Sequence, residues 1–241
     1  MALQFRSRQA ITMTGSWNIL GYALLGGILP AVVWLIFWLQ EDRKRPEPRR
    51  LILRTFIFGM IAVFLVVPFQ KSVDSIFPGV GLIAFLLWAI LEEGFKLGAA
   101  YFGGLKSRED NEPIDPLIYM ITAALGFVAL ENSLFIATPL LDNNSAMGVV
   151  TGNMRFIGAS LLHTFSSSII GIALGLSFYK KHVRAWYTLI AFVLAVSFHS
   201  IFNLTISLNQ AKTVYAFGAV WLGIIAVIFF FEKIKTVAPE K

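Results

Sequence analysis

The residues best able to do chemistry are three glutamates and two histidines that interrupt long apolar runs of the sequence. Glu92 and Glu93 stand side by side in one run, and Glu131, His163 and His199 stand in three later runs. Inside a lipid bilayer an ionisable side chain is costly unless it is paired or hydrated, so such residues mark functional sites. Because these residues come from four separate runs, we expect folding to bring them into one polar cavity.

Lys96 follows the two adjacent glutamates by one helical turn. Positions i and i+4 share a helix face, so we expect Lys96 to pair with Glu92 and to orient it, with Glu93 at i+3 nearly within reach. One lysine cannot neutralise two carboxylates, so the surplus carboxylate needs another partner, a proton or a metal ion. Glu92 is then the expected general base or metal-polarised partner, and Glu93 assists or positions it.

Two kinds of hydrolysis fit this set of residues. In the first, a glutamate activates a water molecule while His199 and Asn203, which share a helix face at i and i+4, stabilise the developing oxyanion. In the second, Glu131, His163 and His199 bind a zinc ion whose water becomes the nucleophile near neutral pH. The residues themselves leave both mechanisms open.

Several other hydrolytic designs are missing from the sequence. There is no Cys, which excludes a cysteine nucleophile and a thiolate metal site. Every Asp stands in or next to a loop, which argues against a paired intramembrane aspartate site, and there is neither an HExxH motif nor a GxSG motif near a partner histidine. Ser167 follows His163 by four residues, so a Ser–His pair is conceivable, although small polar residues also join membrane helices.

The composition is that of a membrane protein. Hydrophobic residues make up 57% of the 241 residues and charged residues only 14%, whereas a soluble domain carries about 25% charged residues. Roughly 20 apolar residues span the ~30 Å hydrocarbon core as a helix. We therefore expect an all-α polytopic protein, a bundle of about seven transmembrane helices forming one membrane-embedded domain over residues 1–241. The apolar runs lie near 17–40, 51–69, 79–102, 115–138, 153–178, 185–207 and 212–231.

The charged loops predict the orientation in the cell membrane. Basic residues gather after the first, third and fifth runs and in the C-terminal tail, whereas the alternate loops hold only Lys71 and Lys212. The positive-inside rule then places the N-terminus outside and the C-terminus in the cytoplasm, although Arg6 and Arg8 would lie on the external side. The net charge of +6 indicates contact with the anionic leaflet of the lipid bilayer and not with nucleic acid.

Depth along each run supports a single site. At a rise of about 1.5 Å per residue, the three glutamates and both histidines fall in the outer half of the membrane. We therefore expect one cavity that is open, or nearly open, to the external side. A proton- or ion-coupled transporter uses the same residue types, but the sequence shows no inverted repeat and the groups do not form a path across the membrane. A non-catalytic scaffold would leave these costly residues unexplained.

Four motifs in order resemble one known family. Glu92 to Lys96 form an EExxK motif, Phe127 to Asn132 form FxxxEN, His163 stands alone on its helix, and His199 with Asn203 forms HxxxN. Together with the segment ending Pro46-Glu47-Pro48, they resemble the PrsW family of intramembrane proteases, distant relatives of the CAAX-processing and bacteriocin-processing membrane proteases. The wider superfamily shows EExxxR and FxxxH, and the departures from it here favour the PrsW branch over prenyl-protein processing.

The resemblance implies a function and a class of partner. It implies cleavage of a single-span membrane protein, such as an anti-sigma factor, near the external side of the membrane. The family is described both as metal-dependent and as glutamic in type, so the resemblance does not choose between zinc and a metal-free mechanism. The oligomeric state stays open.

Overall fold

The computed structural model describes residues 13–42, 45–78, 81–208 and 212–239, and all regular structure in these ranges is helical. The Arg6 and Arg8 positions lie outside them. The elements, in chain order, are α1 (Met13–Leu39), η1 (Gln40–Asp42), α2 (Arg49–Ile76), α3 (Leu82–Ala100), η2 (Tyr101–Leu105), α4 (Asp115–Leu141), α5 (Ser145–Met154), η3 (Arg155–Ala159), α6 (Ser160–Leu176), α7 (Lys181–Leu208) and α8 (Thr213–Ile234).

The predicted bundle of about seven membrane helices is confirmed. Six helices of the described chain are long and apolar enough to cross a membrane, one of them formed by α5, η3 and α6 together over Ser145–Leu176. The seventh, α3, is apolar except for Glu92, Glu93 and Lys96, and all three of these side chains are buried. The protein is therefore a multi-pass membrane protein.

Two helices run further than their apolar runs indicated. α2 continues past Pro68 and ends at Ile76, and the fifth span starts at Ser145 instead of near residue 153. Proline is tolerated within a membrane helix because neighbouring groups satisfy the backbone carbonyl that it leaves free. The added turns are more polar than the hydrocarbon-spanning parts, so hydropathy alone ended both runs too early.

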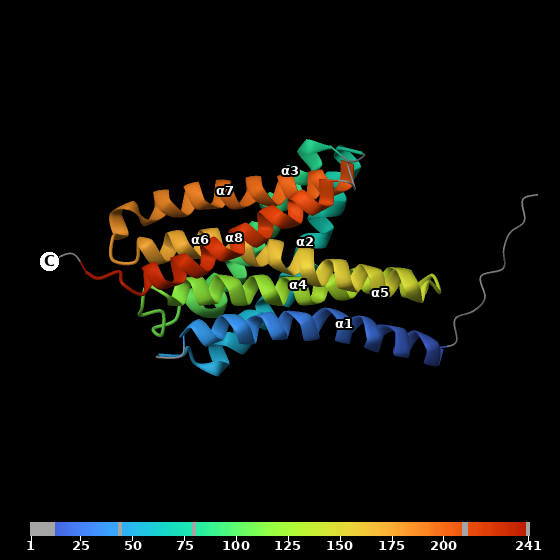
Figure 1. The fold of residues 1–241 in the computed structure, drawn as a ribbon, viewed down its shortest axis with the longest axis horizontal. Coiled ribbons are helices and arrows are strands. Elements are labelled where there is room, and N and C mark those ends of the chain that lie inside the picture. The colour runs from blue at the N-terminus through green and yellow to red at the C-terminus, as the bar shows by residue number, and fades with distance from the viewer. Residues whose placement is uncertain (1–12, 43–44, 79–80, 209–211, 240–241) are drawn as a thin grey trace, which may run out of the picture.

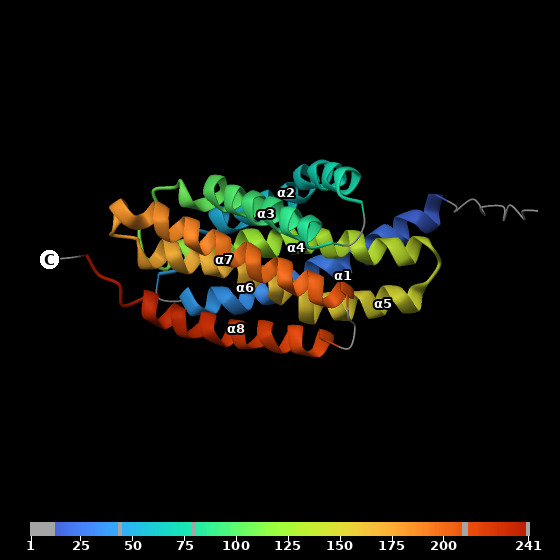
Figure 2. The same cartoon turned by 90° about the horizontal axis from the view of Figure 1, so that it is seen from above.

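α4 is the central helix of the bundle. It packs against α1, α2, α3, α5 and α6, and 83% of its most apolar stretch is buried within the protein. Figures 1 and 2 show α4 enclosed by the other helices, while the N-terminal end of α1 and the α4–α5 connection extend beyond the rest of the bundle. Surrounding one helix on several sides creates an interior in which polar residues are shielded from lipid.

The connections alternate between the two ends of the bundle. The α3–α4 and α6–α7 connections lie at the same end as the C-terminus, on the left in Figure 1, and the α4–α5 connection lies at the opposite end. The basic residues of the described chain concentrate at the left end, where they include Arg49, Arg50, Lys106, Arg108 and Lys181. This is the charge asymmetry on which the predicted orientation rests.

The central helix approaches α2 very closely at a pair of glycines. A Cβ atom built on Gly126 would lie 2.0 Å from the carbonyl oxygen of Phe56, and one built on Gly59 would lie 2.2 Å from the carbonyl oxygen of Ala123. Small residues at such crossings let membrane helices pack backbone to backbone. This contact fixes α4 against α2 and so fixes the heights of the polar residues on both helices.

The glycine crossing gives a test of the packing. We expect Gly126→Val to destabilise the bundle by about 3 kcal/mol, the upper part of the usual range for overpacking, because a helix backbone cannot move aside as a side chain can. The measurement is the thermal unfolding midpoint of detergent-solubilised protein. Gly218→Val on α8 is the control, since nothing lies within 4 Å of a Cβ at Gly218. Equal midpoints for the two variants would contradict this account of the α2–α4 contact.

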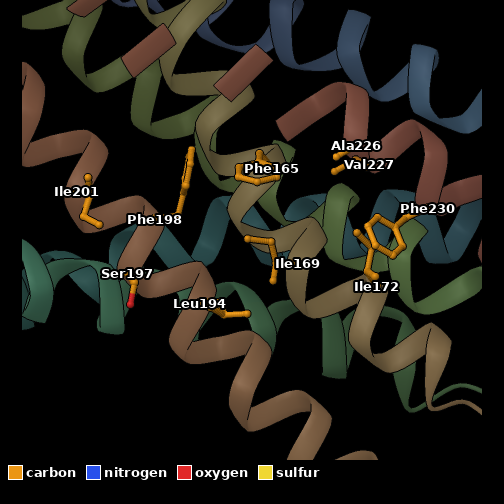
Figure 3. A pocket seen from close by; sticks show the side chains of 10 residues that line it. All are labelled: Phe165, Ile169, Ile172, Leu194, Ser197, Phe198, Ile201, Ala226, Val227 and Phe230. Carbon is orange, nitrogen blue, oxygen red and sulfur yellow. The ribbon is translucent and has the colours of Figure 1, made fainter. Parts of the chain in front are cut away.

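An apolar groove opens on the face formed by α6, α7 and α8. It has a volume of about 510 Å³, and Figure 3 shows Phe165, Leu194, Phe198 and Phe230 among the side chains that line it. Ser197 is the one polar lining residue, and its hydroxyl donates a hydrogen bond to the carbonyl oxygen of Val193 at 2.7 Å. The groove is apolar, and none of its lining residues belongs to the polar interior.

Candidate active site

The predicted polar residues meet in one layer of the bundle. Glu92 comes from α3, Glu131 from α4, His163 from α6 and His199 from α7. Counted from the helix ends at Leu82, Leu141 and Leu208, the residues on α3, α4 and α7 lie roughly 15 Å deep, at about 1.5 Å per residue. The rings of His163 and His199 lie 5.0 Å apart, centre to centre. Four helices thus bring their polar groups together in the interior of the bundle.

Glu93 is completely buried, and its carboxylate accepts four hydrogen bonds. Its Oε1 atom accepts from Lys96 Nζ at 2.7 Å, Ser166 Oγ at 2.8 Å and His199 Nδ1 at 2.8 Å. Its Oε2 atom accepts from Ser167 Oγ at 2.8 Å. A carboxylate with this many donors is held rigidly and has little capacity left for a substrate or a water molecule.

Lys96 pairs with Glu93, and the expected pairing with Glu92 does not form. Its ammonium lies 2.7 Å from Glu93 Oε1 and 2.8 Å from His163 Nδ1. It also lies 5.1 Å from the centre of the Phe127 ring, close enough for a cation–π contact. Lys96 pairs with Glu93, three residues before it, because both side chains point into the same buried pocket. The ion pair then compensates the burial of both charges.

Glu92 is left as the surplus carboxylate that the sequence required. Its Oε1 atom accepts a hydrogen bond from Gln70 Nε2 of α2 at 2.9 Å. Its Oε2 atom is buried and has no hydrogen-bond partner in the described part of the chain. A buried carboxylate oxygen without a partner is costly, and here the free oxygen lies 3.6 Å from His199 Nε2 and 3.9 Å from His163 Nδ1.

Each histidine ring is held from one side by a carboxylate and faces Glu92 with its other nitrogen. Glu93 holds Nδ1 of His199 at 2.8 Å, which leaves Nε2 toward Glu92. The Glu131 Oε2 atom lies 3.2 Å from Nε2 of His163, whose Nδ1 lies on the side of Glu92 and accepts from the Lys96 ammonium. Carboxylates that fix the ring orientation in this manner are typical of metal-binding histidines.

Glu131 has a strong partner that the sequence reading missed. An Arg155 Nη2 atom donates a hydrogen bond to Glu131 Oε2, and the Arg155 Nε atom donates to Asn132 Oδ1 at 2.6 Å. The guanidinium also lies 3.9 Å from the centre of the Phe135 ring. Arg155 begins the π-helical turn η3 between α5 and α6, and such turns often occur at functional sites because they redirect side chains.

The residues present fit a metal ion. Among the described residues, one group of side chains could hold an ion, namely Glu92, His163 and His199, whose ligand atoms all lie within 4.8 Å of one another. Two histidines and one glutamate are a known catalytic zinc set, and the unpartnered Glu92 oxygen is the atom that such a cation would satisfy. Lys96 donates to His163 Nδ1, so its ammonium and a metal ion would compete for this nitrogen.

Two other predicted residues lie away from this group. Ser167 donates its hydroxyl to Glu93 and not to His163, so the structure shows no Ser–His pair there. Asn203 lies on α7 one turn beyond His199 and is partly buried, without a hydrogen bond to any residue of the described chain. Its predicted role at an oxyanion therefore has no support from the contacts in this structure.

Three polar residues of the network were not singled out from the sequence as parts of the site. Gln70 reaches Glu92 from α2, Ser166 donates to Glu93, and Arg155 binds Glu131. Arg155 had a usable signal, because it is an ionisable residue near the expected start of a membrane span. Nothing in the sequence marked Gln70 as a site residue, because it directly follows an apolar run, where polar residues commonly end a membrane span.

Comparison with known proteins places this arrangement in a family. The profile of the PrsW family intramembrane metalloproteases matches residues 47–231. The protease PrsW of Geobacillus kaustophilus (strain HTA426) is 30% identical over 179 residues, 73% of this chain and 76% of that protein. The protease PrsW of Halalkalibacterium halodurans (strain C-125) is 29% identical over 187 residues, 75% of this chain and 81% of that protein.

A more distant relative and the structural comparison complete this result. The protease PrsW of Shouchella clausii (strain KSM-K16) is 24% identical over 195 residues, 80% of this chain and 87% of that protein. No solved structure matches the chain significantly. The family match spans every residue of the polar network, from Gln70 to His199. This chain is therefore a membrane-embedded peptidase that belongs to the PrsW family of intramembrane metalloproteases.

Proposed function

We propose that the chain cleaves a single-span membrane protein, such as an anti-sigma factor, at a peptide bond near the external side of the membrane. One observation carries the proposal: the buried Glu92 Oε2 atom has no hydrogen-bond partner in the described chain and faces two histidine nitrogens at 3.6 and 3.9 Å. A carboxylate oxygen and two imidazole nitrogens that converge in this manner are the groups that can activate a water molecule for hydrolysis.

The metal set of the proposal is Glu92, His163 and His199. The sequence suggested Glu131 in place of Glu92, but the Glu131 carboxylate is engaged by Arg155 and lies against the far nitrogen of His163. A zinc ion bound there would supply an activated water and polarise the scissile carbonyl. In a metal-free form of the same geometry, Glu92 Oε2 would take the proton of the attacking water.

The remaining residues hold this centre in place. Glu93 fixes the His199 ring through Nδ1, and Lys96 compensates the Glu93 charge. Glu131 fixes the other ring, that of His163. We therefore assign Glu93, Lys96 and Glu131 to positioning, while Asn203 stays a candidate for contact with the oxyanion because its amide has capacity to donate.

The basic end of the bundle supports the proposed orientation. With that end in the cytoplasm, the N-terminus lies outside and the polar layer lies in the outer half of the membrane. Glu131 and Arg155 keep 17% of their side-chain surfaces exposed, whereas Glu92, Glu93 and Lys96 are almost fully buried. In this orientation, water and substrate would reach the site from the external side, past Glu131 and Arg155.

The test is cleavage by purified protein in liposomes. The substrate is a single-span test protein with an unfolded segment next to the external end of its span, and mass spectrometry of the fragments locates the cut. We expect one cut within a few residues of the external membrane boundary. A cut at the cytoplasmic boundary would refute the proposed orientation, and cuts scattered along the soluble segment would refute an intramembrane site.

Arg155 supplies a sharper test of the positioning residues. We expect Arg155→Met to lower kcat about 10- to 100-fold, because a hydrogen bond between charged groups contributes about 1.5–3 kcal/mol and its loss frees Glu131 to leave His163. KM should change little, since Arg155 acts through Glu131 and not on substrate. Arg155→Lys, which keeps the charge, should recover part of the loss.

The matched control for Arg155 is Arg108→Met. Arg108 is exposed at the opposite end of the bundle, so its loss should leave kcat unchanged. Wild-type turnover in Arg155→Met would show that the contact between Arg155 and Glu131 does not organise the site. A change confined to KM would instead place Arg155 in contact with substrate.

A further inference from the structure

A second groove lies at the basic end of the bundle, between α3, α6 and α7. It has a volume of about 580 Å³, and its wall consists of residues from α3 and η2 together with Leu174 of α6. Its mouth is formed by Asp110 of the α3–α4 connection and by Arg184 and Thr188 of α7. None of these residues belongs to the polar network around Glu92, so the groove needs an explanation of its own.

The α3 wall of this groove is open backbone. Nothing lies within 4 Å of a Cβ atom built on Gly98, and a Cβ on Gly94 would meet only the Phe192 ring tip at 4.0 Å. Two glycines four residues apart usually let a second membrane helix pack closely. Here no helix of the described chain occupies that place, and apolar side chains such as Leu97 and Tyr101 border the open strip.

The mouth carries one acid and one base, neither of them fully satisfied. Arg184 Nη2 lies 3.9 Å from Asp110 Oδ2, which is beyond hydrogen-bonding distance. Only 8% of the Asp110 side chain is exposed, yet its Oδ1 atom has no hydrogen-bond partner in the described chain. Burial raises the pKa of Asp110 to about 7, so a cationic donor bound at this carboxylate would keep it ionised.

The dimensions match one leaflet of a bilayer. From Gly94 to Leu105 the helical wall rises about 16 Å at about 1.5 Å per residue, close to half of the ~30 Å hydrocarbon core. The charged mouth therefore lies at headgroup height, and the glycine strip lies at the height of acyl chains. A ligand for this groove needs an apolar tail and a head with both a cationic hydrogen-bond donor and an anion.

We propose that this groove binds one phosphatidylethanolamine molecule, with its ammonium group on the Asp110 carboxylate, its phosphate on Arg184 and an acyl chain along Gly94 and Gly98. The zwitterionic head complements this acid–base pair, because its ammonium matches the charge of Asp110 and its phosphate matches the charge of Arg184. Phosphatidylcholine has the same charges but no N–H donor, and phosphatidylglycerol has the anion but no cation. The lipid would lie against α3, the helix that carries Glu92 and Glu93.

The test is native mass spectrometry of the intact protein released from nanodiscs that contain equal amounts of phosphatidylethanolamine and phosphatidylcholine. We expect one phosphatidylethanolamine per chain, retained about ten-fold in preference to phosphatidylcholine, because a charge-assisted hydrogen bond distinguishes them. Asp110→Asn should remove this preference. Gly98→Leu should remove the retained lipid altogether by filling the groove.

The control for Gly98→Leu is Gly218→Leu on α8, which also points a new side chain into open space and should retain the lipid. Equal retention of the two lipids by the wild-type protein would overturn the proposal. So would wild-type retention in Gly98→Leu. Stronger retention of phosphatidylglycerol in a parallel mixture would show that Arg184 acts alone, which also refutes the assignment to phosphatidylethanolamine.

Discussion

Glu92→Gln is expected to abolish cleavage while leaving the fold intact or making it more stable. The substitution removes the anion that faces His163 and His199 and keeps the side-chain shape, so we expect turnover to fall about 100- to 10,000-fold, the usual contribution of a general base or its equivalent. The buried Glu92 Oε2 atom has no partner among the described residues. Losing that unpaired charge should therefore not lower the thermal unfolding midpoint of metal-free protein.

The adjacent glutamate provides the matched comparison. Glu93→Gln should also impair cleavage, but it should lower the unfolding midpoint, because the Glu93 carboxylate accepts four hydrogen bonds, one of them from the buried Lys96. Removing one partner of a buried ion pair costs about 3–5 kcal/mol. The two variants would thus both lose cleavage activity, but only Glu93→Gln would lose stability. Substantial activity in Glu92→Gln would end its assignment to the reacting centre.

The fold could be predicted from the sequence because membranes restrict the choice of structure. Long apolar runs can only become helices in lipid, where every backbone group must be satisfied internally, and each of the seven predicted runs contains a helix in the described chain. The ends of α2 and of the fifth span were wrong by several residues, since the end of an apolar run marks the hydrocarbon boundary and not the end of hydrogen bonding.

The sequence also allowed the prediction that four residues come together, namely Glu92, Glu131, His163 and His199. Each of these residues would be costly in lipid, and equal depths on separate helices leave one shared cavity as the economical arrangement. The sequence did not allow a prediction of which side chains pair with one another inside that cavity. Whether Lys96 binds Glu92 or Glu93 depends on how α3 is rotated about its axis against its neighbours. Helix periodicity alone does not decide which of two adjacent residues points toward Lys96.

The acidic residues near the loops show a second limit of sequence reasoning. Asp42 and Asp115 were recognised only as loop-side residues, yet the structure buries both. Burial raises the pKa of Asp42 to about 6 and that of Glu47 to about 8, and Tyr119 donates a hydrogen bond to Glu47. The connections fold back onto the end of α4, a tertiary contact that neither hydropathy nor charge pattern reveals.

Removal of a bound metal is expected to stop cleavage completely, and one equivalent of zinc per chain should restore it. The structural reason is that both histidine rings already present a nitrogen toward Glu92, each held by a carboxylate behind it. The measurement is cleavage and zinc content after chelation and after addition of zinc. A non-chelating analogue with the same ring system as the chelator serves as the control.

The positioning carboxylates make this prediction specific to the proposed ligands. Glu93→Gln and Glu131→Gln should weaken zinc binding about 10- to 100-fold, the usual effect of losing a carboxylate behind a metal-bound histidine. His199→Ala should remove the bound zinc. Lys96→Met should not weaken zinc binding, because it frees His163 Nδ1 from the ammonium that occupies it. Full activity in zinc-free protein would instead favour the metal-free mechanism, in which Glu92 Oε2 takes the proton of the attacking water and Lys96 stays beside His163.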